Sequence, residues 1–344
     1  MDHTGHCPNA HRSQGVPFQM CLGTEVLSNQ RTQVPRRHGS REPAPIGALD
    51  HRRPGAVALK FQGSASDPGD THGGPIVRAI GVVNLKGGSG KTTTALSLAV
   101  GAAMRDLRIL LVDADPQANA SMTMLDGQPV DDPTLGHVLL DQAGAKEAIR
   151  PTRVGGVDIL PADARLADAA LMLGEQLGRE RRLRAAMRTI EGSYDLLIVD
   201  AAPQLSLVTI NVLNFVRELL VPVDAGLYSV AGLGRLQETV DQVRRFLDNH
   251  ALRISGLVMT RTHRDRATRD IDEQLRGAFG ALVHQATIPH SVRVEEAHAR
   301  HRTVMEFAPR SAPALAYGRL LMEVLGNEQS RSHVAIDADP ADAA

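Results

Sequence analysis

The chain has 344 residues, of which 38 are basic and 39 acidic, and its formal charge of −1 excludes a positive field over the whole molecule. Hydrophobic residues make up 42% and charged residues 22%, which is typical of a globular protein and excludes global disorder. No uncharged stretch reaches the ~18–20 apolar residues of a membrane helix, and two cysteines, Cys7 and Cys21, exclude a disulfide framework.

The two ends of the chain differ in composition from its middle. Residues 1–75 hold 10 glycines, 8 prolines and 6 of the 14 histidines without a sustained apolar period. Such a segment buries too little surface to offset the entropy of ordering it, so we expect a disordered leader. A start codon assigned too far upstream is the alternative. Residues 327–344 are polar and acidic and are expected to form a flexible tail, which leaves 76–326 as one domain.

Order begins with a strand, a turn, a helix and a second strand. The β-branched run at 76–85 predicts a strand that ends in a glycine-rich turn, the small apolar run at 92–104 predicts a helix, and 108–112 predicts the next strand. These elements form a βαβ unit with parallel strands and a right-handed crossover.

The same alternation continues to residue 325. Further strands are predicted at 157–160, 194–199, 218–223, 254–259 and 286–288, and further helices at 162–190, 205–217, 233–249 and 314–325. This alternation predicts a single doubly wound α/β domain, with a mostly parallel sheet and helices on both faces.

The strongest motif is KGGSGKTT at residues 86–93, between the first predicted strand and helix. A phosphate loop needs glycines, whose backbone N–H groups converge on anionic oxygens, a lysine for the β- and γ-phosphates and a hydroxyl for Mg²⁺. Gly87, Gly88 and Gly90 match the cradle, Lys91 the cation and Thr92 the hydroxyl. The sequence therefore predicts a nucleotide-phosphate site.

Two of the chain's four lysines, Lys86 and Lys91, lie in this motif, although arginine occupies the other 34 basic positions. A compact ammonium suits a phosphate cradle better than a planar guanidinium. The usual spacing places a glycine at position 85, where this chain has Leu85 followed by the additional Lys86.

Carboxylates follow two of the predicted strands. Asp113 and Asp115 follow 108–112, and Asp200 follows 194–199. Carboxylates at the carboxyl ends of parallel strands are suited to a site for Mg²⁺ and phosphate. Asp200 would contact Mg²⁺ through water or Thr92, and Asp115 would orient or deprotonate the attacking water. The alternative is that these aspartates only cap the following helices.

Three long motifs in order resemble the ParA family of partition ATPases, which includes MinD, and most of all its small chromosomal type called Soj. They are KGGSGKTT at 86–93, LVDADPQANAS at 111–121 and YDLLIVDAAPQLSLVTINVL at 194–213. VPV at 221–223 and VRVEEA at 292–297 follow in the expected order. The resemblance implies the P-loop NTPase fold of the deviant Walker A type.

The resemblance also implies an ATPase that uses ATP and Mg²⁺ and forms an ATP-dependent sandwich homodimer. Lys86 is similar to the signature lysine that reaches the partner's nucleotide; with Lys91 and Asp115 it forms the implied catalytic set. The implied nucleotide ligands are Lys86, Gly87, Gly88, Ser89, Gly90, Lys91, Thr92, Thr93, Asp200 and Pro289. Thr92 and Asp200 are the implied Mg²⁺ ligands, the latter through water. Ala202 and Gly226 depart from the family pattern, which puts the dimer geometry in question.

Family members differ in what the dimer binds. Residues 253–302 hold nine arginines and five histidines against six acids, and the resemblance implies DNA contacts by Arg293 and by Arg264 or Arg266. The alternative is a solvated helix face with arginine–aspartate pairs. No cysteine follows Cys21, which excludes a cluster-binding relative, and the acidic last residues exclude a basic membrane-surface helix.

We therefore expect a slow, partner-stimulated ATPase that binds double-stranded DNA without sequence preference, with a ParB-type centromere-binding partner and no membrane partner. Its location would be cytoplasmic and nucleoid-associated, and its task chromosome or plasmid segregation. The alternatives are a ParA-like positioning ATPase for a protein cargo or cell-pole complex, and a MinD-like division-site ATPase.

Overall fold

The structure is a computed structural model in which residues 78–190, 192–224 and 229–326 are described. The predicted leader at 1–75, the predicted tail at 327–344 and the departure at Gly226 lie outside the described residues.

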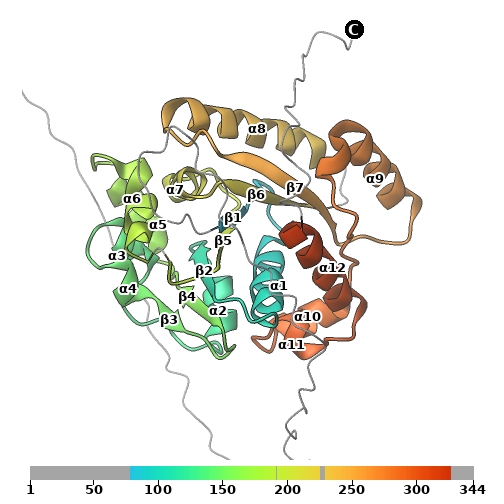
Figure 1. Cartoon of the computed structure of the whole chain (residues 1–344), viewed down its shortest axis with the longest axis horizontal. Helices are drawn as coiled ribbons and strands as arrows, with labels where there is room; N and C mark the ends of the chain where they lie inside the picture. Colours follow the sequence, from blue (N-terminus) through green and yellow to red (C-terminus); the bar gives the residue numbers. More distant parts are fainter. Residues whose placement is uncertain (1–77, 191, 225–228, 327–344) are drawn as a thin grey trace, which may run out of the picture. The chain divides into compact units, whose positions relative to one another are not determined.

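A seven-stranded sheet forms the centre of the molecule (Figure 1). Its strands are β1 (Arg78–Val82), β2 (Ile109–Ala114), β3 (Arg150–Pro151), β4 (Val157–Leu160), β5 (Leu196–Ala201), β6 (Glu218–Asp224) and β7 (Arg253–Thr260). The spatial order is β3-β4-β2-β5-β1-β6-β7, and all neighbours are parallel except β3 and β4. The predicted mostly parallel, doubly wound α/β fold is confirmed.

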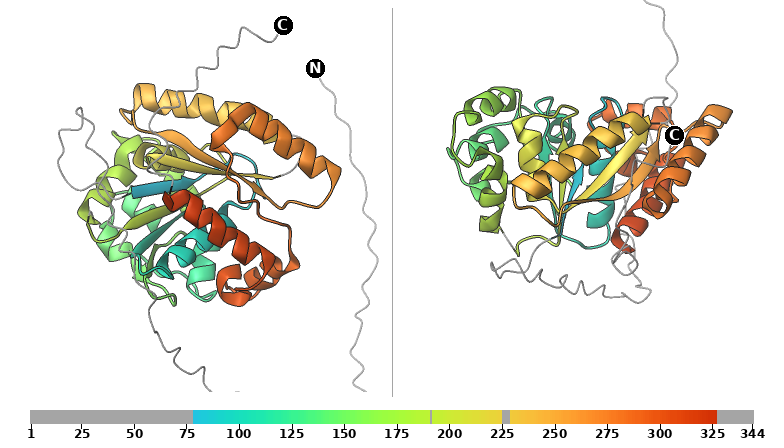
Figure 2. Two further views of the ribbon diagram at one scale, coloured as in Figure 1. Left: turned by 45° about the vertical axis from the view of Figure 1, so that its right-hand side comes forward. Right: turned by 90° about the horizontal axis from the view of Figure 1, so that it is seen from above.

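Helices cover both faces of this sheet (Figure 2). They are α1 (Lys91–Ala103), α2 (Asn119–Met124), α3 (Leu135–Leu139), α4 (Ala145–Ala148), α5 (Leu166–Leu173), α6 (Arg182–Met187), α7 (Leu207–Phe215), α8 (Ser229–Phe246), α9 (Arg266–Phe279), α10 (Val292–His298), α11 (Val304–Phe307) and α12 (Ala312–Gly326), with 3₁₀ turns η1 (Arg179–Arg181), η2 (Arg188–Ile190) and η3 (Gly280–Leu282). One core contains residues of α1, α2, α11 and α12, and the other contains residues of α3 to α9.

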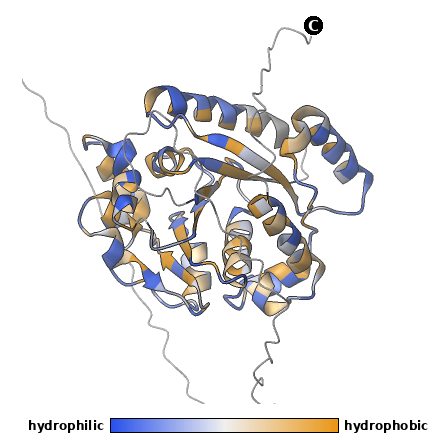
Figure 3. Cartoon of the chain, in the orientation of Figure 1, coloured by the Kyte–Doolittle hydropathy of each residue, from blue (hydrophilic) through white to orange (hydrophobic). Residues whose placement is uncertain are grey.

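The central strands are buried by helices on both faces of the sheet. All six residues of β2 are buried; Ile109 and Leu111 belong to the α1 core, whereas Leu110 and Val112 belong to the opposite core. A strand buried on both faces has a continuous apolar sequence. In Figure 3 the strands are largely hydrophobic, while α9 is mostly hydrophilic. None of the helices in the described part of the chain combines the length and hydropathy needed to cross a membrane.

Two predicted elements are wrong in detail. The expected continuous helix over 162–190 is interrupted after α5, because Gly174 ends it and Gly178 adopts a left-handed φ of 66° before η1. The expected strand at 286–288 does not form. That segment follows β7 with isolated bridges, Leu257 to Val283 and Thr262 to Pro289, and proline has no N–H to extend a ladder.

The parallel strands place their carboxyl ends at one edge of the sheet. In the strand register Asp200 of β5 is opposite both Val82 of β1 and Asp113 of β2. α1 begins at Lys91, just after the loop that follows β1. Ligand sites of open α/β sheets lie outside this edge.

Candidate functional site

A cleft of about 680 Å³ opens at this edge. Loop residues 87–93 form its floor, together with Asp115 after β2 and Thr260 and Arg261 at the end of β7. Pro289 and residues of α10 also line it. The cleft therefore brings together residues 87–93 of the motif, Asp115 and the predicted ligand Pro289, whereas the predicted ligands Lys86 and Asp200 are not among its lining residues.

The loop has the backbone of an anion cradle. Gly88 and Gly90 have φ values of 72° and 82°, which L side chains rarely adopt, and Gly90 is the N-cap of α1. Lys91 is 6% exposed and its Nζ donates to the Lys86 carbonyl at 3.1 Å. Burial lowers the pKa of Lys91, while the charges of Asp200 and Asp115 oppose that shift. The Lys91 ammonium is thus held inside the loop that a phosphate would enter.

The end of β7 supports the loop from the other side. Thr260 Oγ1 donates to the Ser89 carbonyl at 2.9 Å, and Arg261 Nη1 donates to the Gly88 carbonyl at 3.3 Å. Sequence reasoning did not assign either residue to the site. The hydrogen bonds span more than 170 positions of the chain, so no short motif could have predicted them. The one sequence feature that could have pointed to these two residues is their position directly after a predicted strand.

Lys86 lies at the rim of the site. Its backbone N–H donates to Asn84 Oδ1 at 2.9 Å, and its ammonium forms an ion pair with Asp224 of β6 at 3.4 Å. The Lys86 side chain is 37% exposed. In this single chain Lys86 is thus paired at the surface rather than extended.

Asp113 and Asp200 are both buried, but their surroundings differ. Asp113 accepts hydrogen bonds from the Asp115 N–H at 3.2 Å and from the Ser121 N–H and hydroxyl at 2.8 and 2.7 Å. Neither carboxylate oxygen of Asp200 has a well-formed hydrogen-bond partner among the described residues, although the Thr92 hydroxyl is close enough to affect its pKa. Asp200 therefore has unused acceptor capacity next to Thr92 and Lys91 of the loop.

Burial shifts the pKa of both carboxyls upward. Burial raises the pKa of Asp113 to about 6, against the hydrogen bonds from Ser121 and Asp115. Burial, and then the charge of Asp113, raise the pKa of Asp200 well above its ordinary value, while Thr92 and Lys91 oppose the shift. A positive ligand next to Asp200 would relieve this unfavourable charge burial.

Asp115 faces the cleft itself. Its Oδ1 accepts the Gln117 N–H at 2.9 Å, and its side chain lines the cavity. This turn keeps the carboxylate beside the loop without an ion pair to Lys91. The structure thus places Lys91, Thr92, Thr93, Asp115 and Pro289 in the lining of one cleft. Asp200 is not a lining residue, but it lies close enough to Thr92 and Lys91 to interact with both. The ligand roles of these residues stay predictions.

Comparisons with known proteins agree with this geometry. An AAA domain family model matches residues 77–254. The chromosome partitioning protein ParA of Caulobacter vibrioides is 35% identical over 258 residues, which cover 74% of this chain and 96% of that protein. The chromosome-partitioning ATPase Soj of Thermus thermophilus is 38% identical over 254 residues, covering 74% and 97%. The chain belongs to the ParA/Soj family of partition ATPases.

A solved structure that contains a nucleotide analogue has a similar fold. Cobyrinic acid a,c-diamide synthase from Mycobacterium smegmatis, with a bound ATP analogue and magnesium, matches with a TM-score of 0.64 and 28% identity over 74% of this chain and 97% of that chain. The residues of the present cleft fit such a group. The unpartnered Asp200 oxygens and the Thr92 hydroxyl are hard oxygen donors of the kind Mg²⁺ takes beside substrate phosphates, and the loop glycines leave N–H groups open to phosphate.

The predicted DNA-contacting arginines lie outside the cleft. Arg264 is exposed before α9, Arg266 is 92% exposed in its side chain and pairs with Asp270 at 3.7 Å, and Arg293 is 60% exposed and pairs with Glu296 at 2.7 Å. The rings of His263, just before Arg264, and His290, just before α10, are stacked with centroids 4.9 Å apart. Arg264 precedes α9, Arg266 begins it and Arg293 lies in α10, and the last two have acidic partners on their own helices.

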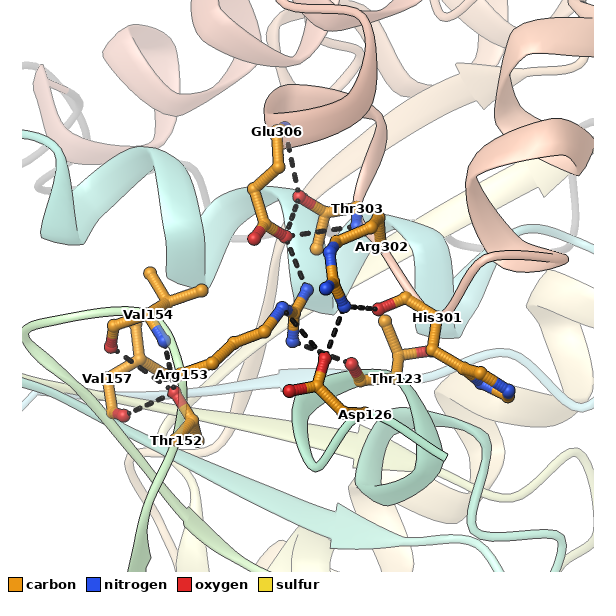
Figure 4. A network of polar contacts seen from close by, with 10 residues as sticks. All are labelled: Thr123, Asp126, Thr152, Arg153, Val154, Val157, His301, Arg302, Thr303 and Glu306. Atoms are coloured by element: carbon orange, nitrogen blue, oxygen red, sulfur yellow. Dashed lines mark hydrogen bonds and ion pairs between the residues drawn. The ribbon is translucent and has the colours of Figure 1, made fainter. Parts of the chain in front are cut away.

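A polar network connects α2 with the segment after α10 (Figure 4), and two of its residues, Thr123 and His301, line the cleft. Arg153 donates to the Thr123 carbonyl and to Glu306, both at 2.7 Å, and lies 3.5 Å from Asp126. Arg302 also bonds Asp126. The network joins the end of α2 to the start of α11, so these two segments are tied together.

Proposed function

We propose that this ParA-family chain hydrolyses ATP slowly, dimerises when ATP binds and holds double-stranded DNA without sequence preference. A ParB-type partner stimulates hydrolysis and release, and the cycle segregates a chromosome or plasmid in the nucleoid region of the cytoplasm. The observation that carries the ATPase part is the buried, unpartnered Asp200 beneath a phosphate loop that holds a buried Lys91.

Each residue of the cleft has a distinct task in this proposal. Lys91 and the loop N–H groups bind the phosphates, and Thr92 and Asp200 hold Mg²⁺, the latter through water. Bound Mg²⁺ supplies neutralising charge to the phosphate oxygens. Asp115, which faces the cleft, orients the attacking water and takes its proton.

Lys86 acts across the dimer in this proposal. Its ion pair with Asp224 is half-exposed and 3.4 Å long, so exchanging Asp224 for a partner's phosphate requires little rearrangement of a buried group. A lysine in this position stabilises transition-state charge on the partner's nucleotide, as an arginine finger does.

The DNA surface consists of Arg264, Arg266 and Arg293. The pairs of Arg266 with Asp270 and of Arg293 with Glu296 are exposed and therefore weak, so DNA phosphates can replace the carboxylates. The net charge of the chain is −1, which makes the doubling of this patch in a dimer important for affinity.

A gel shift on random double-stranded DNA tests the function. We expect a shift that requires ATP and weakens between 50 and 200 mM salt, about the range over which phosphate contacts lose affinity. Arg293→Glu should abolish the shift while leaving ATP-dependent dimerisation intact, and Arg188→Glu, an exposed arginine of η2, is the matched control. A shift that does not depend on ATP, or one that survives Arg293→Glu, would contradict the proposed DNA surface.

Asp115→Ala separates binding from turnover. The variant should retain ATP-dependent DNA binding and lose at least tenfold in ATP turnover, because it lacks the group that positions water. Phosphate release at saturating ATP measures the effect. Turnover equal to that of the unaltered protein would remove Asp115 from its assigned role.

A further inference from the structure

One wall of the cleft is made by α10, and its last residue, His298, has no role in the family motifs described above. The helix is held by the completely buried Ala297 and by Ser291, whose Oγ accepts the Arg293 N–H at 3.2 Å. His298 lines the cleft together with Val294 and Glu295 of the same helix. A side chain from the carboxyl-terminal part of the chain thus faces the phosphate loop.

His298 contacts that loop directly. Its Nε2 lies 3.3 Å from Oγ1 of Thr93, which is in the first turn of α1, two positions after Lys91. The N–H groups of this turn point into the space where a nucleotide's phosphates bind. A phosphate oxygen beside Thr93 is therefore within reach of the imidazole that already touches Thr93.

The segment that follows His298 is anchored. The Arg302 N–H closes the end of α10 on the Ala297 carbonyl at 2.9 Å, and the Arg302 side chain bonds Asp126 in the network of Figure 4. Thr303 then caps α11 through its bond to Glu306. His298 is held from both sides, which limits the entropy lost when its ring binds a ligand.

The charge state of the ring suits a hydrogen-bond donor. His298 is exposed, but it lines the cleft and contacts Thr93, and partial loss of hydration there lowers its pKa while the charge of Glu295 opposes the shift. A neutral imidazole carries one N–H donor, which the proposed contact requires on Nε2, and a phosphate oxygen is an acceptor only. Thr93 is the partner of Nε2 in the free chain, and a phosphate can take its place.

We propose that His298 is a nucleotide-binding residue that donates a hydrogen bond to the phosphate oxygen next to Thr93, a phosphate present in both ADP and ATP. The inference rests on the proposed ATP binding and adds a ligand from α10 to the phosphate loop. Lys91 serves the β- and γ-phosphates, whereas Thr93 lies farther along α1, so the contact does not involve the γ-phosphate.

Calorimetric titration of the full chain with MgATP and MgADP tests the inference. His298→Ala should weaken both nucleotides about tenfold, the value of one hydrogen bond to a charged group. His298→Gln places an amide N–H donor near the position of Nε2 and should restore affinity to within about threefold. His250→Ala removes an exposed histidine outside the cleft and should leave both affinities unchanged.

Each result has a defined meaning. Equal affinities in His298→Ala and the unaltered protein overturn the inference, as does a Gln variant that binds as weakly as the Ala variant. Weakening of ATP alone would place His298 at the γ-phosphate and overturn the assigned contact. If the unaltered protein binds neither nucleotide, the proposed function fails instead, which is a separate outcome.

Discussion

The carboxyl ends of β2 and β5 carry two aspartates that share a strand register and a depth of burial but have opposite environments. Asp113 on β2 receives three hydrogen bonds, two of them from Ser121. Asp200 on β5 has no well-formed hydrogen bond in the described part of the chain, although Thr92 and Lys91 of the phosphate loop are close enough to affect its pKa. The first arrangement organises the protein, and the second leaves a carboxylate for a ligand.

This difference changes the cost of burying each charge. Burial raises the pKa of both carboxyls, but the Ser121 and Asp115 donors offset part of that cost for Asp113, whereas Asp200 has no well-formed hydrogen bond to offset it among the described residues. The Ser121 hydroxyl that bonds Asp113 also accepts the Ala162 N–H at 2.9 Å, so β2, α2 and the end of β4 form one hydrogen-bonded unit. No such unit surrounds Asp200 among the described residues.

The largest expected effect is at Lys91, the cation whose charge acts on Asp200. Lys91→Ala should weaken ATP binding at least 100-fold, because the loop loses its phosphate cation and the carboxylate beneath is left uncompensated. Titration with a fluorescent ATP analogue measures the affinity. Lys146→Ala, an exposed lysine of α4, is the matched control. Retained affinity in Lys91→Ala would mean that the β5 end is not a ligand site.

The next effect separates the two aspartates by the sign of the change in stability. Asp113→Ala should lower the free energy of unfolding by about 2 kcal/mol, because the Ser121 and Asp115 donors lose their acceptor. Asp200→Asn should raise it by about 1 kcal/mol and abolish ATP turnover, because it removes a buried charge that only a ligand compensates. Urea unfolding without nucleotide measures both, and changes of the same sign would break the comparison.

The smallest effect is a dependence of that stabilisation on pH. The pKa of Asp200 is raised in the folded chain, so below the ordinary aspartate pKa of about 4 the carboxyl is protonated in both the folded and unfolded states and Asp200→Asn changes little. As pH rises, the unfolded state loses its proton first and the unaltered protein loses stability relative to the variant. The gain from Asp200→Asn should therefore grow between about pH 4 and pH 7. A gain that shrinks over this range would show that Asp200 has a stabilising partner.

Apolar runs and glycine-rich turns predicted much of the fold, because they depend on residues that are neighbours in the chain. The apolar run of β4 was placed at its observed bounds, and the motif at 86–93 was predicted to follow the first strand and to open a helix, as it does after β1 and into α1. The errors occurred where local pattern is ambiguous. The region 162–190 has helical composition, yet the backbone breaks at Gly174 and Gly178, and 286–288 lies beside β7 without forming a ladder.

The residues of the site also fall into a group that local sequence predicted and a group that it did not. The loop glycines, Lys91 and the aspartates after the strands were predicted, because a glycine-rich loop and the end of a strand can each be recognised from consecutive residues. Thr260 and His298 were missed, because each contacts the loop across a separation of about 170 to 205 positions that no short motif records.

The sequence by itself determined the parallel α/β sheet and the positions of the glycine-rich loop and the aspartates at its carboxyl edge, since apolar periodicity and glycine backbone freedom are properties of neighbouring residues. Only the tertiary structure decided which carboxylate is partnered, that Lys86 pairs with Asp224, and that α10 brings His298 to Thr93. Those outcomes depend on where segments distant in the chain meet, and burial there sets the electrostatic cost of every charge.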